Sequence, residues 1–191
     1  MLDKSANAGQ HPYAEREQDC YETPPEAVEA LLKVEQLPRD IWEPACGPGS
    51  IVRVLRAHGH AVTASDLHDY SFGVAEIDFL SGGFIPVGGA IVTNPPYQLA
   101  QQFVEQALKL SPRVIMLLRL AFLESEKRRK ILEESGLARI HVFRNRLPMM
   151  HRRGWNGPKA SSAIPFAWFV WERGYQGPTT IDRISWEPST P

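Results

Sequence analysis

Apolar residues recur at two different spacings along the chain, and the alternation between them predicts the fold class. Apolar positions three or four residues apart, bounded by capping or turn residues, predict helices at residues 23–37, 50–59, 98–110 and 125–136. Short apolar runs between turn residues predict strands at residues 40–43, 61–66, 73–80, 90–93, 113–123, 138–144, 165–173 and 179–186. Strands that alternate with helices indicate an α/β protein with a doubly wound, mostly parallel sheet and helices on both faces.

The predicted strands differ in strength, and their ends matter more than their interiors. Residues 113–123 form the most apolar run and are expected to be a central strand, whereas residues 73–80 give the weakest strand signal. Ligands of such sheets bind beyond the carboxyl ends of the strands. We therefore expect the chemistry of this protein where the residues that follow the strands converge.

Length and composition predict one domain at residues 19–191, preceded by a polar, flexible arm at residues 1–18. No stretch approaches the ~20 continuous apolar residues of a membrane span, and the amino terminus has no signal-peptide core. Cys20 and Cys46 match no zinc spacing and are too few for a disulfide framework. These features predict a reduced, cytoplasmic protein without a metal site.

The formal net charge is −1, but the charges are unevenly distributed. No Asp or Glu occurs from Ser135 to Trp171, and this stretch carries a group of basic residues: Arg139, His141, Arg144, Arg146, His151, Arg152, Arg153 and Lys159. A local basic surface fits a polyanion such as nucleic acid. A solvated face with folded counter-charges beside it fits the same pattern equally well.

The segment EPACGPGS is typical of a nucleotide-binding turn between a strand and a helix. Gly47 and Gly49 allow a tight turn and close approach of the backbone to a ligand. Asp66 follows Gly47 by 19 residues, at the end of the next predicted strand, where a carboxylate can accept hydrogen bonds from ribose hydroxyls. The third dinucleotide glycine and a lysine-bearing phosphate loop are missing, which disfavours NAD and ATP.

The segment NPPY, residues Asn94 to Tyr97, ends another predicted strand. Neither Pro95 nor Pro96 has a backbone N–H, so the strand ladder must stop here. The motif therefore fixes an amide and a phenol ring at the predicted ligand-binding edge.

In linear order, the segments DCYETPP, EPACGPG, SDL, IDF and NPPY resemble the class I S-adenosylmethionine-dependent methyltransferases. The resemblance spans roughly residues 19 to 173 and is specifically to the enzymes that methylate adenine N6 in DNA. The segment SSAIPFAWFVWERG is similar to the late strand of small, phage-type members. The resemblance implies a Rossmann-like, seven-stranded sheet with a late antiparallel strand, S-adenosylmethionine as the cofactor, and a bacterial or phage origin.

By this resemblance, the oxygen of Asn94 and the carbonyl of Pro95 accept the two amino hydrogens of adenine, while Tyr97 stacks on the extruded base. Pro96 helps Pro95 to keep the turn rigid. Methyl transfer then proceeds by direct attack on the methyl group. The implied cofactor-binding residues are Tyr21, Thr23, Pro24, Glu43, Ala45, Gly47, Gly49, Asp66, Leu67, Asp78, Phe79 and Asn94.

A long basic loop near residues 144–162 is the candidate contact with DNA, because the spacing of the motifs leaves no room for a separate target-recognition domain. Its candidate nucleic-acid contacts are Arg144, Arg146, Arg152, Arg153, Trp155 and Lys159. Trp155 fits a base-stacking role and a loop-anchoring role equally well. Phosphate contacts carry no sequence information, so we expect low sequence specificity or a protein partner that supplies specificity. The oligomeric state is left open.

The NPPY motif predicts a substrate with a planar, conjugated NH2 group, but it does not predict which kind of molecule carries that group. Adenine or guanine amino groups of RNA and the glutamine amide of a protein therefore remain alternative substrates. A catalytically inactive methyltransferase fold that binds nucleic acid is an alternative of another class.

Overall fold

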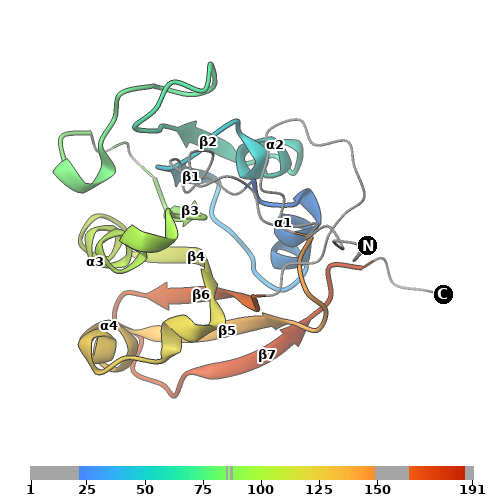
Figure 1. The fold of residues 1–191 in the computed structure, drawn as a ribbon, viewed down its shortest axis with the longest axis vertical. Helices are drawn as coiled ribbons and strands as arrows, with labels where there is room; N and C mark the ends of the chain where they lie inside the picture. The colour runs from blue at the N-terminus through green and yellow to red at the C-terminus, as the bar shows by residue number, and fades with distance from the viewer. Residues whose placement is uncertain (1–21, 85, 87, 149–163, 188–191) are drawn as a thin grey trace, which may run out of the picture.

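The computed structural model describes residues 22–84, 86, 88–148 and 164–187. Its strands form one sheet in the order β2-β1-β3-β4-β6-β5-β7 (Figure 1). The strands are β1 (Asp40–Glu43), β2 (Ala61–Ala64), β3 (Ala90–Thr93), β4 (Arg113–Arg119), β5 (Leu137–Phe143), β6 (Phe166–Glu172) and β7 (Thr180–Ile184). All neighbours are parallel except that β6 runs antiparallel to both β4 and β5. The predicted mostly parallel, seven-stranded sheet with a late antiparallel strand is confirmed.

Helices pack on both faces of this sheet, as the alternating pattern predicted (Figure 1). The helices are α1 (Pro25–Leu32), α2 (Ser50–Ala57), α3 (Ala100–Leu110) and α4 (Arg129–Glu133), with short 3-10 helices η2 (Phe79–Ser81), η3 (Tyr97–Leu99), η4 (Leu120–Leu123) and η5 (Glu126–Arg128). Helices α1 and α2 share one buried cluster with the sheet, and α3 and α4 share the other. None of the helices in the described ranges is long and apolar enough to cross a membrane.

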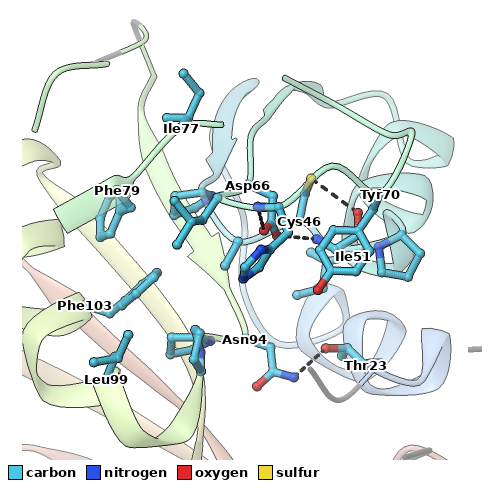
Figure 2. Close-up of a pocket in the computed structure, with 18 of the residues that line it drawn as sticks. Thr23, Cys46, Ile51, Asp66, Tyr70, Ile77, Phe79, Asn94, Leu99 and Phe103 are labelled. Atoms are coloured by element: carbon cyan, nitrogen blue, oxygen red, sulfur yellow. Dashed lines mark hydrogen bonds between the residues drawn. The ribbon is translucent and has the colours of Figure 1, made fainter. Parts of the chain in front are cut away.

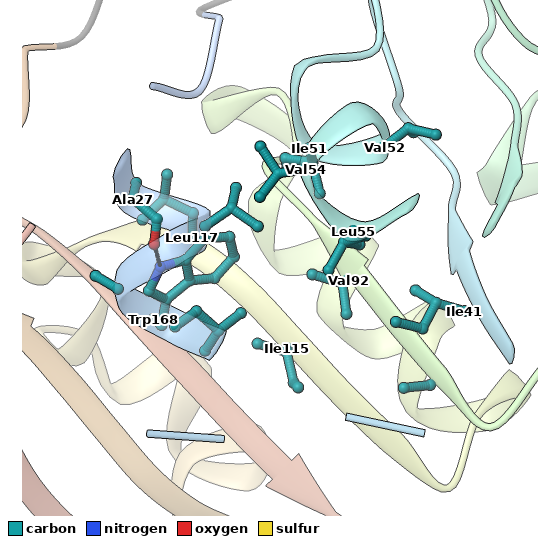
Figure 3. Close-up of a cluster of buried hydrophobic side chains, with 14 of the residues drawn as sticks. Ala27, Ile41, Ile51, Val52, Val54, Leu55, Val92, Ile115, Leu117 and Trp168 are labelled. Carbon is teal, nitrogen blue, oxygen red and sulfur yellow. Dashed lines mark hydrogen bonds between the residues drawn. The ribbon is translucent and has the colours of Figure 1, made fainter. Parts of the chain in front are cut away.

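Two tryptophans of β6 show how the core is closed on each face. Successive residues of a strand point to opposite faces, so Trp168 and Trp171 enter different clusters. Trp168 is fully buried and its indole N–H donates to the carbonyl of Ala27 in α1 at 2.9 Å (Figure 3). Trp171 is also fully buried and donates to the carbonyl of Ile131 in α4 at 2.8 Å. Each ring therefore adds apolar contact while its polar atom remains satisfied.

The predicted strand at residues 73–80 is wrong. Only Val74 is bridged to the sheet, through Ser65, and the chain then turns away into η2. Gly73 and Glu76 have positive φ angles of 72° and 59°, which an extended strand cannot contain. The segment is a loop at the end of β2, and β7 at the opposite edge completes the sheet.

Two other predicted boundaries also shift. Helix α1 ends at Leu32 rather than at residue 37, and the predicted strand 113–123 ends at Arg119, where η4 begins. The first shift has a clear cause. Glu35, in the segment predicted to be helical, is drawn into a group of ion pairs against the sheet.

This group, the Glu35 cluster, lies at the amino end of β4 and consists of Glu35, Arg113, Arg139, His141 and Glu172. Glu35 Oε1 accepts hydrogen bonds from Arg139 Nε at 2.6 Å and pairs with His141 Nε2 at 2.7 Å. Burial alone raises the pKa of Glu35, but the hydrogen bonds from His141 and Arg139 and the charges of Arg139 and Arg113 lower it to about 2. The cluster therefore ties the segment after α1 to β4, β5 and β6.

Candidate functional site

A pocket of about 220 Å³ lies at the carboxyl ends of β1, β2 and β3, where the sequence motifs were expected to converge (Figure 2). The predicted site residues that line it are Thr23, Ala45, Gly47, Asp66, Leu67, Asp78, Phe79, Asn94, Pro95, Pro96 and Tyr97. Residues that are more than 70 positions apart, such as Thr23 and Asn94, are brought into direct contact here. Among the described residues, no cluster of His, Cys, Asp and Glu side chains could hold a metal ion.

The glycine turn and the acid after β2 are joined by hydrogen bonds. Gly47 adopts a positive φ of 49°, and its N–H donates to Asp66 Oδ2 at 2.8 Å. The other carboxylate oxygen, Oδ1, accepts from the N–H of His68 at 2.9 Å. Each carboxylate oxygen can accept a second hydrogen bond. Asp66 is therefore a buried carboxylate in a fixed orientation that still has the capacity to bind hydroxyl groups in the pocket.

Gly49 lies outside the pocket lining and has a packing role. Its φ of +90° is unfavourable for any other residue, and a Cβ at this position would come within 2.3 Å of the Phe72 ring. The close approach that requires a glycine here is therefore to the Phe72 ring. Arg53 and Arg56 in turn lie over the Phe72 ring, at 5.6 Å and 5.9 Å.

Glu43 and Pro24 were also expected to bind the cofactor, and neither is among the residues that line the pocket. Glu43 is fully buried, and its Oε1 accepts a hydrogen bond from the N–H of Ala45 at 3.2 Å. Burial, with a smaller contribution from nearby Asp66, raises the pKa of Glu43 to about 8. Glu43 therefore supports the glycine turn from below as a neutral acid at pH 7. Pro24 precedes α1, and its carbonyl accepts from Ala27 N–H at 2.9 Å.

The acceptor motif begins where β3 ends, and the amide of Asn94 is oriented by Thr23. Thr23 is 4% exposed, and its hydroxyl accepts a hydrogen bond from Asn94 Nδ2 at 3.1 Å (Figure 2). Because the amide nitrogen is engaged by Thr23, the carbonyl oxygen points away from it. Pro95 is buried, and Tyr97 starts η3, which leads into α3. The side chain of Asn94 is thus anchored at both its backbone and its nitrogen.

The wall opposite the glycine turn is flat and apolar. The Phe79 ring packs against Trp42 at 5.2 Å and against Phe103 at 4.9 Å between centroids. Asp78 Oδ1 accepts from the N–H of Leu80 at 2.9 Å and so caps η2. Ile77 completes this side of the pocket. A flat ring with an edge amine fits this combination of an aromatic face and a neighbouring carboxylate.

Sequence reasoning missed several lining residues, among them Cys46, Ile51, His68, Tyr70, Leu99 and Phe103. Burial raises the pKa of the Cys46 thiol to about 12, with added contributions from nearby Glu43 and Asp66, so it is an unreactive wall residue. Arg119, to which no motif assigns a role, lies with its guanidinium carbon 4.3 Å from the centre of the Tyr97 ring. Its position at the end of β4 was the signal that could have identified it.

The predicted nucleic-acid residues are only partly within the described chain. Arg144 and Arg146 line a groove of about 550 Å³ that follows β5 and reaches Phe166. Phe166 packs against Tyr97 at 5.5 Å, so this groove adjoins the acceptor motif. Arg152, Arg153, Trp155 and Lys159 lie outside the described residues, as do Tyr21 and the predicted amino-terminal arm.

No protein-family model and no curated protein sequence matches this chain. Solved structures do match it in fold. A proposed class I S-adenosylmethionine-dependent methyltransferase from Listeria monocytogenes matches with a TM-score of 0.57 at 14% identity, over 82% of this chain and 62% of that one. The modification subunit of a proposed type I restriction enzyme from Vibrio vulnificus matches with a TM-score of 0.60 at 14% identity, over 87% of this chain and 46% of that one.

A proposed RNA methyltransferase from Pyrococcus horikoshii matches with a TM-score of 0.60 at 15% identity, over 86% of this chain and 90% of that one. The chain thus spans less than two thirds of the length of the first two proteins and nearly all of the third. At these identities the matches show that the fold is that of the class I methyltransferases.

Proposed function

We propose that this protein transfers a methyl group from S-adenosylmethionine to the N6 amino group of adenine in DNA, with low sequence specificity. The observation that carries the proposal is the placement of Asn94. Its amide stands at the end of β3 in the pocket wall, with its nitrogen held by Thr23, and is followed by two prolines and Tyr97. Such a rigid display of acceptor atoms suits a substrate that must present two N–H groups.

The pocket residues fit the cofactor. When bound, S-adenosylmethionine supplies an electrophilic methyl group on a positively charged sulfur. Asp66, buried and fixed by the N–H groups of Gly47 and His68, would hold the ribose hydroxyls. Asp78 and the face of Phe79 would hold the adenine. The methionine part would lie near Thr23, Ala45 and the glycine turn, with Tyr21 as a further proposed contact.

The proposed role of Asn94 and Pro95 is to orient the amino group of the substrate. The oxygen of Asn94 and the carbonyl of Pro95 would accept the two hydrogens of the amino group, which fixes its direction of attack. Thr23 keeps the amide of Asn94 in one orientation, so no reordering is needed at each turnover. An amide is too weak a base to take up the proton. The proton would leave after transfer, when the amine carries a positive charge.

The DNA is proposed to lie along the basic surface beyond Tyr97. Arg144 and Arg146 supply charge beside the acceptor motif, and Arg152, Arg153, Trp155 and Lys159 are proposed as further contacts on the same loop. Tyr97 would stack on the extruded base. Contacts to phosphates confer affinity without sequence information, so specificity would be low or would come from a protein partner.

The test is methyl transfer from labelled S-adenosylmethionine to double-stranded DNA, single-stranded DNA and RNA, with the product nucleoside identified by mass spectrometry. We expect N6-methyladenine in DNA, and a loss of about 10²- to 10³-fold in rate for Asn94→Ala with cofactor affinity retained. Label in RNA alone would replace DNA as the substrate, and label only in a glutamine-containing protein, offered as a fourth acceptor, would replace it with a protein amide. Cofactor binding with no transfer to any acceptor would identify an inactive binding subunit.

A further inference from the structure

We propose that a phosphate of the substrate strand binds in a second groove, between the first turn of α3 and Arg128. The inference rests on the proposed function, because it places the nucleotide that neighbours the target base. The groove has a volume of about 370 Å³ and is lined by Tyr97, three glutamines (Gln98, Gln101 and Gln102), Phe122 and Arg128.

Tyr97 connects this groove to the reaction site. The same residue lines the pocket that contains Asn94 and the groove beside Arg128. A strand whose base reaches Asn94 and stacks on Tyr97 therefore has its adjoining backbone at the mouth of the groove. Tyr97 is the one residue that the two linings share, and no residue of the glycine turn lines the groove, so a nucleotide there would not compete with the cofactor.

Side-chain amides at the start of α3 contribute donors to the groove. Helix α3 continues directly from η3, and the N–H of Ala100 donates to the Tyr97 carbonyl, so the donors here are side chains and not free backbone N–H groups. Gln98, Gln101 and Gln102 line the groove. The first turn of α3 contains no acidic residue that would repel an anion.

Arg128 faces the first turn of α3 and is held in place. Its guanidinium carbon lies 4.5 Å from the centre of the Phe122 ring, and Nη1 donates to the Phe122 carbonyl at 2.7 Å. The neighbouring Arg129 pairs with three carboxylates, whereas within the described residues Arg128 has no ion pair. Arg128 is thus a fixed guanidinium whose charge is not neutralised by any carboxylate in the described part of the chain.

The chemistry of the lining selects a phosphate. It offers guanidinium and amide donors and no carboxylate; Glu105, which accepts from Gln101 Nε2 at 3.0 Å, lies outside the lining. Arg119 lies outside the lining, but its guanidinium on the Tyr97 ring adds positive charge beside the groove. Convergent donors with net positive charge match an anion with several acceptor oxygens.

The test is the affinity for short fluorescent single-stranded DNA of mixed sequence, measured by anisotropy at several salt concentrations with S-adenosylhomocysteine present. Arg128→Gln should weaken binding about tenfold and reduce the slope of log affinity against log salt by about 0.7. Arg129→Gln is the matched control, because it removes the same charge from a residue outside the groove. We expect it to bind almost as the wild-type protein does.

Gln102→Glu is a second groove variant, chosen because it should reduce DNA affinity without destabilising the fold. An acidic residue in the first turn of a helix is favourable, so the melting temperature should be kept or raised, while DNA affinity falls about tenfold. Gln106→Glu, one turn later in α3 and outside the groove lining, is its control. Wild-type affinity in both Arg128→Gln and Gln102→Glu would overturn the groove as a phosphate site.

The same proteins separate this inference from the proposed function. Methyl transfer by wild-type protein together with unchanged DNA affinity in both groove variants would reject the phosphate site and keep the enzyme. The expected affinity losses without any methyl transfer would keep the phosphate site and reject the proposed reaction. A wild-type protein that does not bind DNA at all would overturn the phosphate site.

Discussion

Polar side chains have different roles at the two ends of the strands, which we call the amino edge and the carboxyl edge of the sheet. At the amino end of β4, Glu35 is surrounded by Arg113, Arg139 and His141, and each charge is neutralised by another within the chain. At the carboxyl edge, Asp66 and Asn94 are also fixed by hydrogen bonds, but both line a pocket. The same sheet thus separates charges that hold the fold from polar groups that are available to ligands.

The largest expected effect is a loss of stability when the Glu35 cluster, at the amino end of β4, is disrupted. Glu35→Ala removes the shared partner of Arg113, Arg139 and His141 and leaves Glu172 as the one carboxylate of the cluster for two guanidinium groups, which should cost about 3–5 kcal/mol of unfolding free energy. Urea unfolding measures this loss. Glu29→Ala is the control, since Glu29 forms an exposed pair with His58 and should change stability by less than about 1 kcal/mol. Equal losses in both variants would contradict the difference drawn between buried and exposed pairs.

Glu43→Gln should instead stabilise the protein, increasingly as the pH rises. The folded-state pKa of Glu43 is raised from 4.5 to about 8, so the stability that comes from its protonated form is complete below pH 4.5 and is lost as the pH rises through about 8. Glutamine mimics the protonated form at every pH. The gain in unfolding free energy over wild type, followed by urea unfolding, should therefore grow between these two pH values. A gain that does not vary with pH would contradict a buried, neutral Glu43.

At the carboxyl edge, Asp66→Ala should weaken cofactor binding about a hundredfold, because it removes the proposed acceptor of the ribose hydroxyls and the anchor of Gly47. Isothermal titration calorimetry measures the affinity. Asp69→Ala, an exposed carboxylate of the same loop outside the pocket lining, is the control. Unchanged affinity in Asp66→Ala would remove Asp66 from the cofactor site.

The smallest of these effects is expected for Thr23→Val, which keeps the shape of Thr23 and removes the acceptor of the Asn94 amide. The rate of methyl transfer should fall about tenfold, because the amide of Asn94 is then free to rotate, while cofactor affinity stays close to wild type. Thr23→Ser, which retains the hydroxyl, should restore the rate. Failure of the serine variant to restore it would mean that Thr23 acts through packing.

The comparison also shows which features could be predicted from sequence. The residues at the carboxyl edge follow strands in recognisable motifs, so the positions of Asp66, Asn94 and Tyr97 at one edge were predictable. The Glu35 cluster depends on contacts between positions up to 106 residues apart, from Glu35 to His141, and no local pattern signals such contacts. Glu35 consequently appeared to belong to a helix that in fact ends at Leu32.

A motif identifies the turn but not the direction in which each of its residues points. Gly49 and Glu43 belong to the predicted cofactor segment, yet Gly49 packs on Phe72 and Glu43 lies beneath the turn. The strand predicted at residues 73–80 failed for a related reason. Its apolar residues suggested a strand, but the backbone at Gly73 and Glu76 adopts positive φ angles that only the tertiary structure reveals.

Methyl transfer to DNA per folded molecule, measured for the wild-type, Asn94→Ala and Glu35→Ala proteins, tests the central claim most directly. The account predicts that Asn94→Ala keeps wild-type stability and loses transfer, whereas Glu35→Ala loses stability and keeps transfer in the fraction that remains folded. Wild-type transfer by Asn94→Ala would contradict the assignment of the carboxyl edge as the reaction site.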